Sequence, residues 1–167
     1  MSENGPVNPA AWTPPHMFRS LAVRRLLSRH GQLWSEHVSA EHTSIQFGLL
    51  LCLARSESGL SQTEIASELA VDKASLTELV GRMASRGLVA VHRDARDGRR
   101  RVATLTEAGQ EVLAALHGPA LEVNHRLFAP LTDAEADQLM GLLERVLAHD
   151  PAHDATRDPA QDPTGTL

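Results

Sequence analysis

Aromatic side chains are scarce in this sequence, where two Trp, three Phe and no Tyr make up 3% of 167 residues. Apolar residues nevertheless reach 42%, so we expect a core that consists mainly of leucine, valine and alanine. The length suits one domain with tails. The single cysteine, Cys52, excludes an internal disulfide and any metal site that needs several cysteines.

Long apolar runs are missing as well. None approaches the ~20 residues of a membrane-spanning helix, and residues 1–15 lack a basic start followed by an apolar stretch. We therefore expect a cytoplasmic protein with no membrane partner. The sequence contains no glycine-rich phosphate loop, no Gly-x-Ser-x-Gly and no His-Glu-x-x-His, so we expect neither enzyme activity nor a cofactor.

Positive charge is in deficit, with a formal net charge of −5, but the charges are unevenly distributed. Residues 93–101 hold five Arg and two Asp, whereas residues 150–167 hold four Asp and one Arg. A local basic patch indicates nucleic-acid binding better than the net charge does. We expect residues 1–15, rich in Pro and Asn, to be flexible, and the acidic tail 150–167 to be disordered.

The residues between these tails predict helices and one β-hairpin. Ser61 with Glu64, and Thr132 with Glu135, form capping boxes that begin helices. Valine- and threonine-rich stretches joined by a loop with Gly98 predict the hairpin. We expect a first helix over 16–37 and a second that follows Thr43 and contains the apolar run 47–54. Further helices are expected to begin at 61, to run from 72 to Gly87, to run from 106 or 107 to 128, and to follow 132. The two strands are expected over 88–93 and 101–106.

Two of these helices, joined at 70–71, form a helix–turn–helix. On the second helix, Leu76, Leu79, Val80 and Met83 recur at helical spacing and predict a buried face, so the polar residues lie on the other face. The first turn of this helix would meet base edges in the major groove, and the hairpin arginines would contact phosphates or the minor groove. The candidate DNA-binding residues are Ser61, Gln62, Thr63, Lys73, Ser75, Thr77, Glu78, Arg82, Arg93, Arg96, Asp97, Arg99, Arg100 and Arg101. A helical hairpin with a solvated charged face is the structural alternative.

The segments SQTEIASELAVDKASLTELVGRMASRGLV (61–89) and RDARDGRRRVATLTEAG (93–109) resemble the MarR-type winged-helix regulators, and the resemblance covers about residues 17–148. It implies a mainly α (α+β) domain over 16–149, with a winged helix at 43–109 and dimerisation helices at 16–38 and 110–149. It also implies a homodimer that binds double-stranded, pseudo-palindromic operator DNA. Asp97 would brace the wing by pairing with a nearby arginine, and Arg99 would approach the minor groove; which arginine enters the groove is left open, because this wing is richer in Arg than most.

The segment RRLLSRHGQLWSEHVSAEHTSIQF (24–47) resembles the members that respond to hydroxybenzoates such as protocatechuate. The resemblance implies a repressor released by a small aromatic acid, with Arg24 on the carboxylate, His30 on a ring hydroxyl and Trp34 beside them. On one helix, Arg24 and His30 are ~9 Å apart along the axis and roughly 120° apart in direction, so they would bracket a ring from two sides. Each residue also has a structural interpretation: Arg24 as a surface charge, His30 as a buried histidine with its bonds satisfied, and Trp34 as packing in a dimer core.

Three other functions have some support in the sequence. Cys52 would serve a thiol-responsive regulator, but its place inside an apolar run favours a buried structural cysteine. A metal-responsive regulator would use His37, Glu41 and His42 with His117 or His125, but positions 37 and 42 do not share a helix face. A winged-helix protein-interaction module without DNA binding would not need five arginines in its hairpin. The sequence leaves repressor and activator open.

Overall fold

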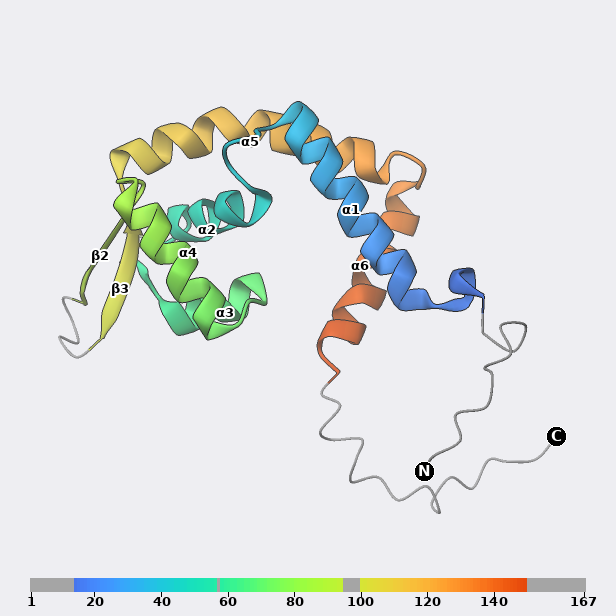
Figure 1. Cartoon of the computed structure of the whole chain (residues 1–167), viewed down its shortest axis with the longest axis horizontal. Coiled ribbons are helices and arrows are strands. Elements are labelled where there is room, and N and C mark those ends of the chain that lie inside the picture. Colours follow the sequence, from blue (N-terminus) through green and yellow to red (C-terminus); the bar gives the residue numbers. More distant parts are fainter. Residues whose placement is uncertain (1–13, 57, 95–99, 150–167) are drawn as a thin grey trace, which may run out of the picture. The chain divides into compact units, whose positions relative to one another are not determined.

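The computed structural model describes residues 14–56, 58–94 and 100–149. The chain divides into two compact units, residues 1–127 and 128–167, and each is described by itself. Helices dominate, and a small antiparallel sheet accompanies them (Figure 1). The mainly α fold expected from the sequence is therefore confirmed. The expectations for residues 1–13 and for the tail from 150 onward lie outside the described residues.

The first unit begins with a short 3-10 helix, η2 (Pro15–Met17), followed by α1 (Arg19–His37). The prediction that one helix starts at His16 was wrong by three residues, because Phe18 has extended backbone (φ −82°, ψ 102°) and separates the two elements. Trp34 lies near the end of α1 and is buried. Its indole Nε1 donates a hydrogen bond to the carbonyl of His42 at 2.6 Å, which ties α1 to the loop that follows.

The next helix, α2 (Ser44–Ala54), is capped by Thr43. The Thr43 hydroxyl accepts from the Gln46 backbone N–H while the Gln46 side chain accepts from the Thr43 N–H. The apolar run of α2 buries Leu49, Leu50 and Leu53, and this core helix packs against α3 (Gln62–Leu69) and β3 (Arg101–Leu105).

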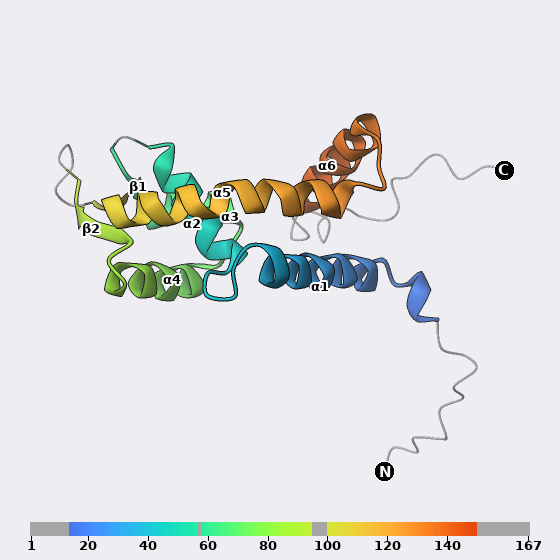
Figure 2. The same cartoon turned by 90° about the horizontal axis from the view of Figure 1, so that it is seen from above.

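The sheet has three strands in the order β1–β3–β2, all antiparallel. Strand β2 (Val89–Arg93) pairs along its whole length with β3, from Val89 opposite Leu105 to Arg93 opposite Arg101. This is the predicted hairpin. In both views it lies at the edge of the lobe that contains α2, α3 and the helix over Lys73–Ser85 (Figures 1 and 2). The sequence did not predict β1 (Leu60–Ser61), because two residues are too few for an alternating pattern to be read.

The core of this lobe joins α2, α3, the sheet and α4 (Lys73–Ser85). The four residues predicted on the inner face of α4 are all buried, as is Ile65 of α3. Because the apolar stripe of α4 faces this core, its polar stripe faces solvent. The buried apolar residues of the core are Leu49, Leu50, Leu53, Ile65, Leu76, Leu79, Val80, Met83, Leu88, Val89 and Ala103.

The connection from β3 to α5 (Glu107–Phe128) is fixed by Thr106 and Gly109. The Thr106 hydroxyl donates to the carbonyl of Gly87 at 2.7 Å and accepts from the backbone N–H of Gly109 at 3.0 Å. A Cβ on Gly109 would lie 2.1 Å from the carbonyl oxygen of Leu88, so only glycine lets α5 approach β2 this closely. Gly87 itself has φ +72° and follows α4, as predicted for a C-terminal glycine.

The second unit contains α6 (Asp133–Leu147), which begins at the predicted capping box. The Thr132 hydroxyl accepts from the Glu135 N–H at 3.4 Å, and the Glu135 carboxylate accepts from the Thr132 N–H at 2.8 Å. None of the residues of α6 is buried. Its exposed large apolar side chains include Met140, Leu142, Val146 and Leu147.

Candidate nucleic-acid interface and ligand cavity

The turn between α3 and α4 places the second helix through two local features. Ala70 adopts the left-handed conformation (φ 50°, ψ 43°) and ends α3. Asp72 then caps α4, because its carboxylate accepts from the N–H groups of Ala74 and Ser75 at 3.0 and 2.9 Å. The Ser75 hydroxyl, and next its backbone N–H, lower the pKa of Asp72, so the cap is ionised at neutral pH.

The outer face of α4 carries the predicted polar residues in solvent. Arg82 forms an ion pair with Glu78 one turn before it, which offsets part of its positive charge. The Thr77 hydroxyl lies 2.8 Å from the Lys73 carbonyl and 3.1 Å from Gln62 Oε1, so it links α4 to the start of α3. Ser75 donates its hydroxyl to Asp72 at 2.6 Å and therefore serves the cap.

A groove of about 640 Å³ runs between α3, α4 and the hairpin. Candidate residues from all three parts line it: Ser61, Gln62, Thr63, Lys73, Thr77, Arg100 and Arg101. Glu78 and Arg82 lie farther along the exposed face of α4, and Arg93 ends β2 opposite Arg101. Arg96, Asp97 and Arg99 lie outside the described residues, so the roles predicted for them remain predictions.

A second cavity, of about 480 Å³, lies between α1, α2 and α5. It has an aromatic wall, in which the ring centroids of His30 and Trp34 are 5.9 Å apart and those of Trp34 and Phe47 are 5.4 Å apart. Ile45 and Leu51 of α2 face this space and are each 37% exposed. The cavity therefore combines an apolar interior with an open side, which suits a small ligand.

The structure brings together two of the three predicted ligand residues. His30 and Trp34 line the cavity, whereas Arg24 is exposed on α1 and is not among the lining residues. Trp34 is buried within the chain itself and forms part of the cavity wall; its packing in a dimer core remains a prediction.

Three polar residues of the cavity were missed by sequence reasoning as ligand contacts. They are Ser44 on α2 and His117 and Asn124 on α5; His117 had been weighed only as a metal ligand. The signal in the sequence is the spacing of positions 117, 121 and 124, which share one face of a helix. That spacing alone does not reveal which helix lies opposite.

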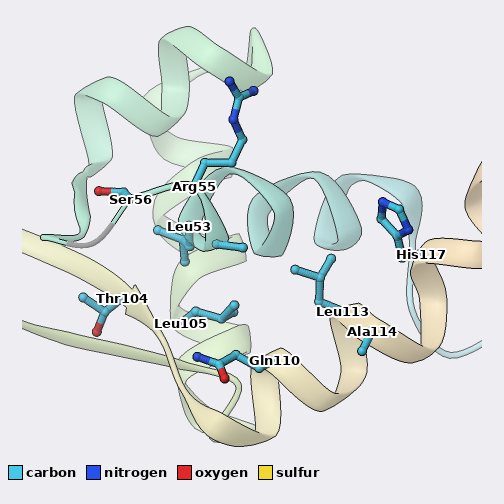
Figure 3. Close-up of a pocket in the computed structure, with 10 residues that line it drawn as sticks. Leu53, Arg55, Ser56, Thr104, Leu105, Gln110, Leu113, Ala114 and His117 are labelled. Carbon is cyan, nitrogen blue, oxygen red and sulfur yellow. The ribbon is translucent and has the colours of Figure 1, made fainter.

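A third cavity, of about 790 Å³, lies between the end of α2, β3 and the start of α5 (Figure 3). Leu53, Leu105 and Leu113 form its apolar part, and His117 lines both this cavity and the one beside Trp34. Figure 3 shows the Arg55 guanidinium directed away from α5. The cavity therefore presents apolar surface with little charge directed into it.

The alternative regulators find little support in the described residues. Cys52 is half-buried, and not fully buried as the sequence predicted. This partial burial raises the pKa of its thiol, and the nearby Glu68 carboxylate adds to the effect; a protonated thiol is a weak nucleophile. Among residues 14–56, 58–94 and 100–149, no three His, Cys, Asp or Glu side chains are grouped as a metal site requires. Within the same residues, no helix has the length and apolar character needed to cross a membrane.

A helix–turn–helix followed by a basic two-stranded hairpin defines the winged-helix class of DNA-binding domain. Residues 43–100 match the sequence model of the MarR family. Transcriptional regulator HosA of Escherichia coli is 30% identical over 125 residues, which cover 75% of this chain and 91% of HosA. The chain belongs to the MarR family and is a DNA-binding transcription regulator.

Two solved structures extend this likeness beyond the helix–turn–helix. The PcaV transcriptional regulator from Streptomyces coelicolor, in complex with its natural ligand, matches with a TM-score of 0.76 at 33% identity and covers 81% of this chain and 96% of PcaV. BpsR of Bordetella bronchiseptica, whose DNA binding is regulated by 6-hydroxynicotinic acid, matches with a TM-score of 0.67 at 26% identity and covers 77% of this chain and 97% of BpsR.

Proposed function

We propose that this regulator is a repressor that binds a pseudo-palindromic operator as a homodimer and is released by a small aromatic carboxylic acid. The observation that carries the proposal is the aromatic-walled cavity of about 480 Å³ beside Trp34, within the same unit as the helix–turn–helix. The groove supports the DNA part, because Lys73 and Arg101 place positive charge beside the exposed face of α4.

The homodimer is supported by apolar side chains left in solvent. Near the N-terminal end, Met17, Phe18, Leu21, Val23 and Leu27 are between 40% and 65% exposed, and in the second unit Val146 and Leu147 are more than 70% exposed. Several large apolar side chains exposed close together along the chain, in each unit, are expected where a partner covers them. A two-fold dimer would present two recognition helices to half-sites about 34 Å apart.

The aromatic acid is supported by the chemistry of the cavity. Trp34 and Phe47 offer ring faces, and His30, Ser44 and Asn124 offer hydrogen-bonding groups for hydroxyl or carboxylate oxygens. BpsR, the relative regulated by 6-hydroxynicotinic acid, is a precedent for an aromatic hydroxy acid as effector. The acid would favour a dimer whose recognition helices no longer fit the operator, and this coupling is reciprocal.

The DNA part is tested by fluorescence anisotropy with a duplex taken from upstream of the protein's own gene. We expect sub-micromolar binding at low salt, a steep loss of affinity with rising salt, and a mass in solution twice that of the chain. A folded dimer that binds no duplex at low salt would refute the proposal.

The effector part is tested by calorimetry and by release of labelled DNA with 4-hydroxybenzoate, protocatechuate and 6-hydroxynicotinate. We expect His30→Gln, at the cavity wall, to weaken acid binding by roughly tenfold or more, since a hydrogen bond to a charged group contributes ~1.5–3 kcal/mol. Arg24→Gln tests the carboxylate role that the resemblance assigns to Arg24, which does not line the cavity of this chain. DNA affinity without acid should stay unchanged. Arg25→Gln is the matched control, because Arg25 is exposed on the same turn of α1 as Arg24. If Arg24→Gln behaves like Arg25→Gln, Arg24 does not hold the carboxylate.

A further inference from the structure

Arg100 lies at the loop end of the hairpin, directly before β3, and its side chain sits between two carboxylates. Its guanidinium donates a hydrogen bond to Glu64 of α3, and its Nη1 lies 3.9 Å from Oδ2 of Asp94. The Asp94 side chain is only 16% exposed, and that of Arg100 is 39% exposed. The arginine therefore connects the hairpin to the first helix of the helix–turn–helix.

The carboxylate on the α3 side is itself held in place. Glu64 Oε2 accepts from the Ser61 backbone N–H and from the Ser61 hydroxyl, each at 2.8 Å, as the second half of the capping box. The Ser61 N–H, and next the Arg100 guanidinium, hold the pKa of Glu64 at about 2. Glu64 is thus ionised at neutral pH and fixed at the N-terminus of α3.

The backbone at Arg100 is also part of the hairpin. The Arg100 carbonyl accepts from the Asp94 N–H at 2.8 Å, one step beyond the pairing of Arg93 with Arg101. A shift of Arg100 relative to α3 would therefore move both strands. The Arg100 side chain therefore adds a contact between the hairpin and α3, next to the backbone pairing of Ser61 with Val102.

We propose that Arg100 is a positioning residue that fixes the wing against the N-terminus of α3, and that it does not contact DNA phosphates or bases. To reach a phosphate, the guanidinium would have to leave two carboxylates that already offset its charge. This inference rests on the proposed binding of operator DNA. It separates Arg100 from Arg101, which lines the same groove and is exposed.

The decisive variant is Glu64→Gln, because a purely electrostatic role and a positioning role of the Arg100–Glu64 pair predict opposite changes in DNA affinity. Loss of a negative charge beside DNA should tighten binding if Arg100 and Glu64 act only through the electrostatic field. Loss of the Arg100–Glu64 ion pair that positions the wing should weaken binding, and we expect a three- to tenfold loss of affinity. The cap survives the change, since Gln46 fills the same position in the capping box of α2. Glu68→Gln is the control, because it removes the same charge from an exposed position on α3.

The arginines are compared through the salt dependence of binding, with the tightest duplex that the wild-type protein selects from a random library. Arg101→Gln should lower affinity and reduce the slope of log K against log salt by about one, as loss of a phosphate contact does. Arg100→Gln should lower affinity three- to tenfold with the slope unchanged. A slope reduced equally by both variants would overturn the proposal.

A measurement without DNA keeps the two proposals distinguishable. Amide hydrogen exchange of strands β2 and β3 should be three- to tenfold faster in Glu64→Gln than in Glu68→Gln. If the wild-type protein binds no duplex, the proposed function fails. The hydrogen-exchange measurement still tests whether Arg100 and Glu64 position the wing. Unchanged exchange in Glu64→Gln, or tighter DNA binding by it, would refute the positioning role.

Discussion

Replacement of Thr106 by valine tests how the wing is joined to the long helix α5. Valine keeps the shape of the side chain but removes the hydroxyl that bonds the Gly87 carbonyl at 2.7 Å and the Gly109 N–H at 3.0 Å. Loss of a helix cap typically costs ~1 kcal/mol, and a second hydrogen bond contributes about 0.5–1.5 kcal/mol. Because Thr106 is half-buried, water replaces part of this, and we expect a loss of about 1–2 kcal/mol.

The assay is urea unfolding at one fixed protein concentration, since the stability of the proposed dimer would depend on concentration. With an m value of ~2 kcal/mol per molar urea, the middle of the usual range, the midpoint should fall by roughly 0.5–1 M with m unchanged. Thr104→Val is the matched control: Thr104 is half-buried like Thr106, but it lies within β3, caps no helix, and its hydroxyl lies 3.2 Å from Nε2 of the exposed His92, so its midpoint should change by less than half as much. Equal midpoints for Thr106→Val and the wild type would refute the reasoning.

Three further outcomes are expected. Gly109→Ala should prevent stable folding or strongly lower the unfolding midpoint, since the added Cβ would meet the Leu88 carbonyl. Gly81→Ala is the control: its Cβ has open space around it, so the change should stabilise α4 by ~0.5–1 kcal/mol. Thermal unfolding midpoints are measured for both variants, and similar values would contradict the packing argument. The pKa of Glu64 is lowered from its usual value to about 2. The ionised Glu64 carboxylate therefore contributes fully to stability above about pH 4.5, and this contribution is lost as the pH falls toward 2. Over this range the urea midpoint should fall less steeply with decreasing pH in Glu64→Gln than in the wild type, and an equal fall in both would count against the ionised cap. Finally, because burial raises the pKa of Cys52, its reaction with a disulfide reagent at pH 7.5 should be slower than that of free cysteine. A rate equal to that of free cysteine would favour the thiol-responsive alternative.

Local signals predicted most of the elements correctly, because each depends on neighbours in the chain. The capping boxes at Ser61 and Thr132 and the cap at Asp72 involve residues within three positions of one another. The inner face of α4 follows from helical periodicity alone, and all four predicted residues are buried. The errors were equally local: the helix start at Arg19 depends on the backbone of Phe18, and β1 is too short to carry a pattern.

The candidate sites could be predicted only in part, because they join segments that are distant in the sequence. Sequence resemblance predicted His30 and Trp34 for the ligand, and both line the cavity, but the opposite wall with Asn124 comes from a helix about ninety positions later. Arg100 was grouped with the other arginines because composition cannot distinguish a cation that meets DNA from one that meets Glu64, 36 positions earlier in the chain.

The sequence by itself determined most of the helices, their caps, the basic hairpin and the class of protein, since each depends on residue types at fixed distances along the sequence. Tertiary structure alone decided which side chains share the cavity beside Trp34 and which arginine of the groove is held by carboxylates. The reason is physical: cavities and ion pairs form between elements brought together by burial of a common core, and that packing is not encoded in any single segment.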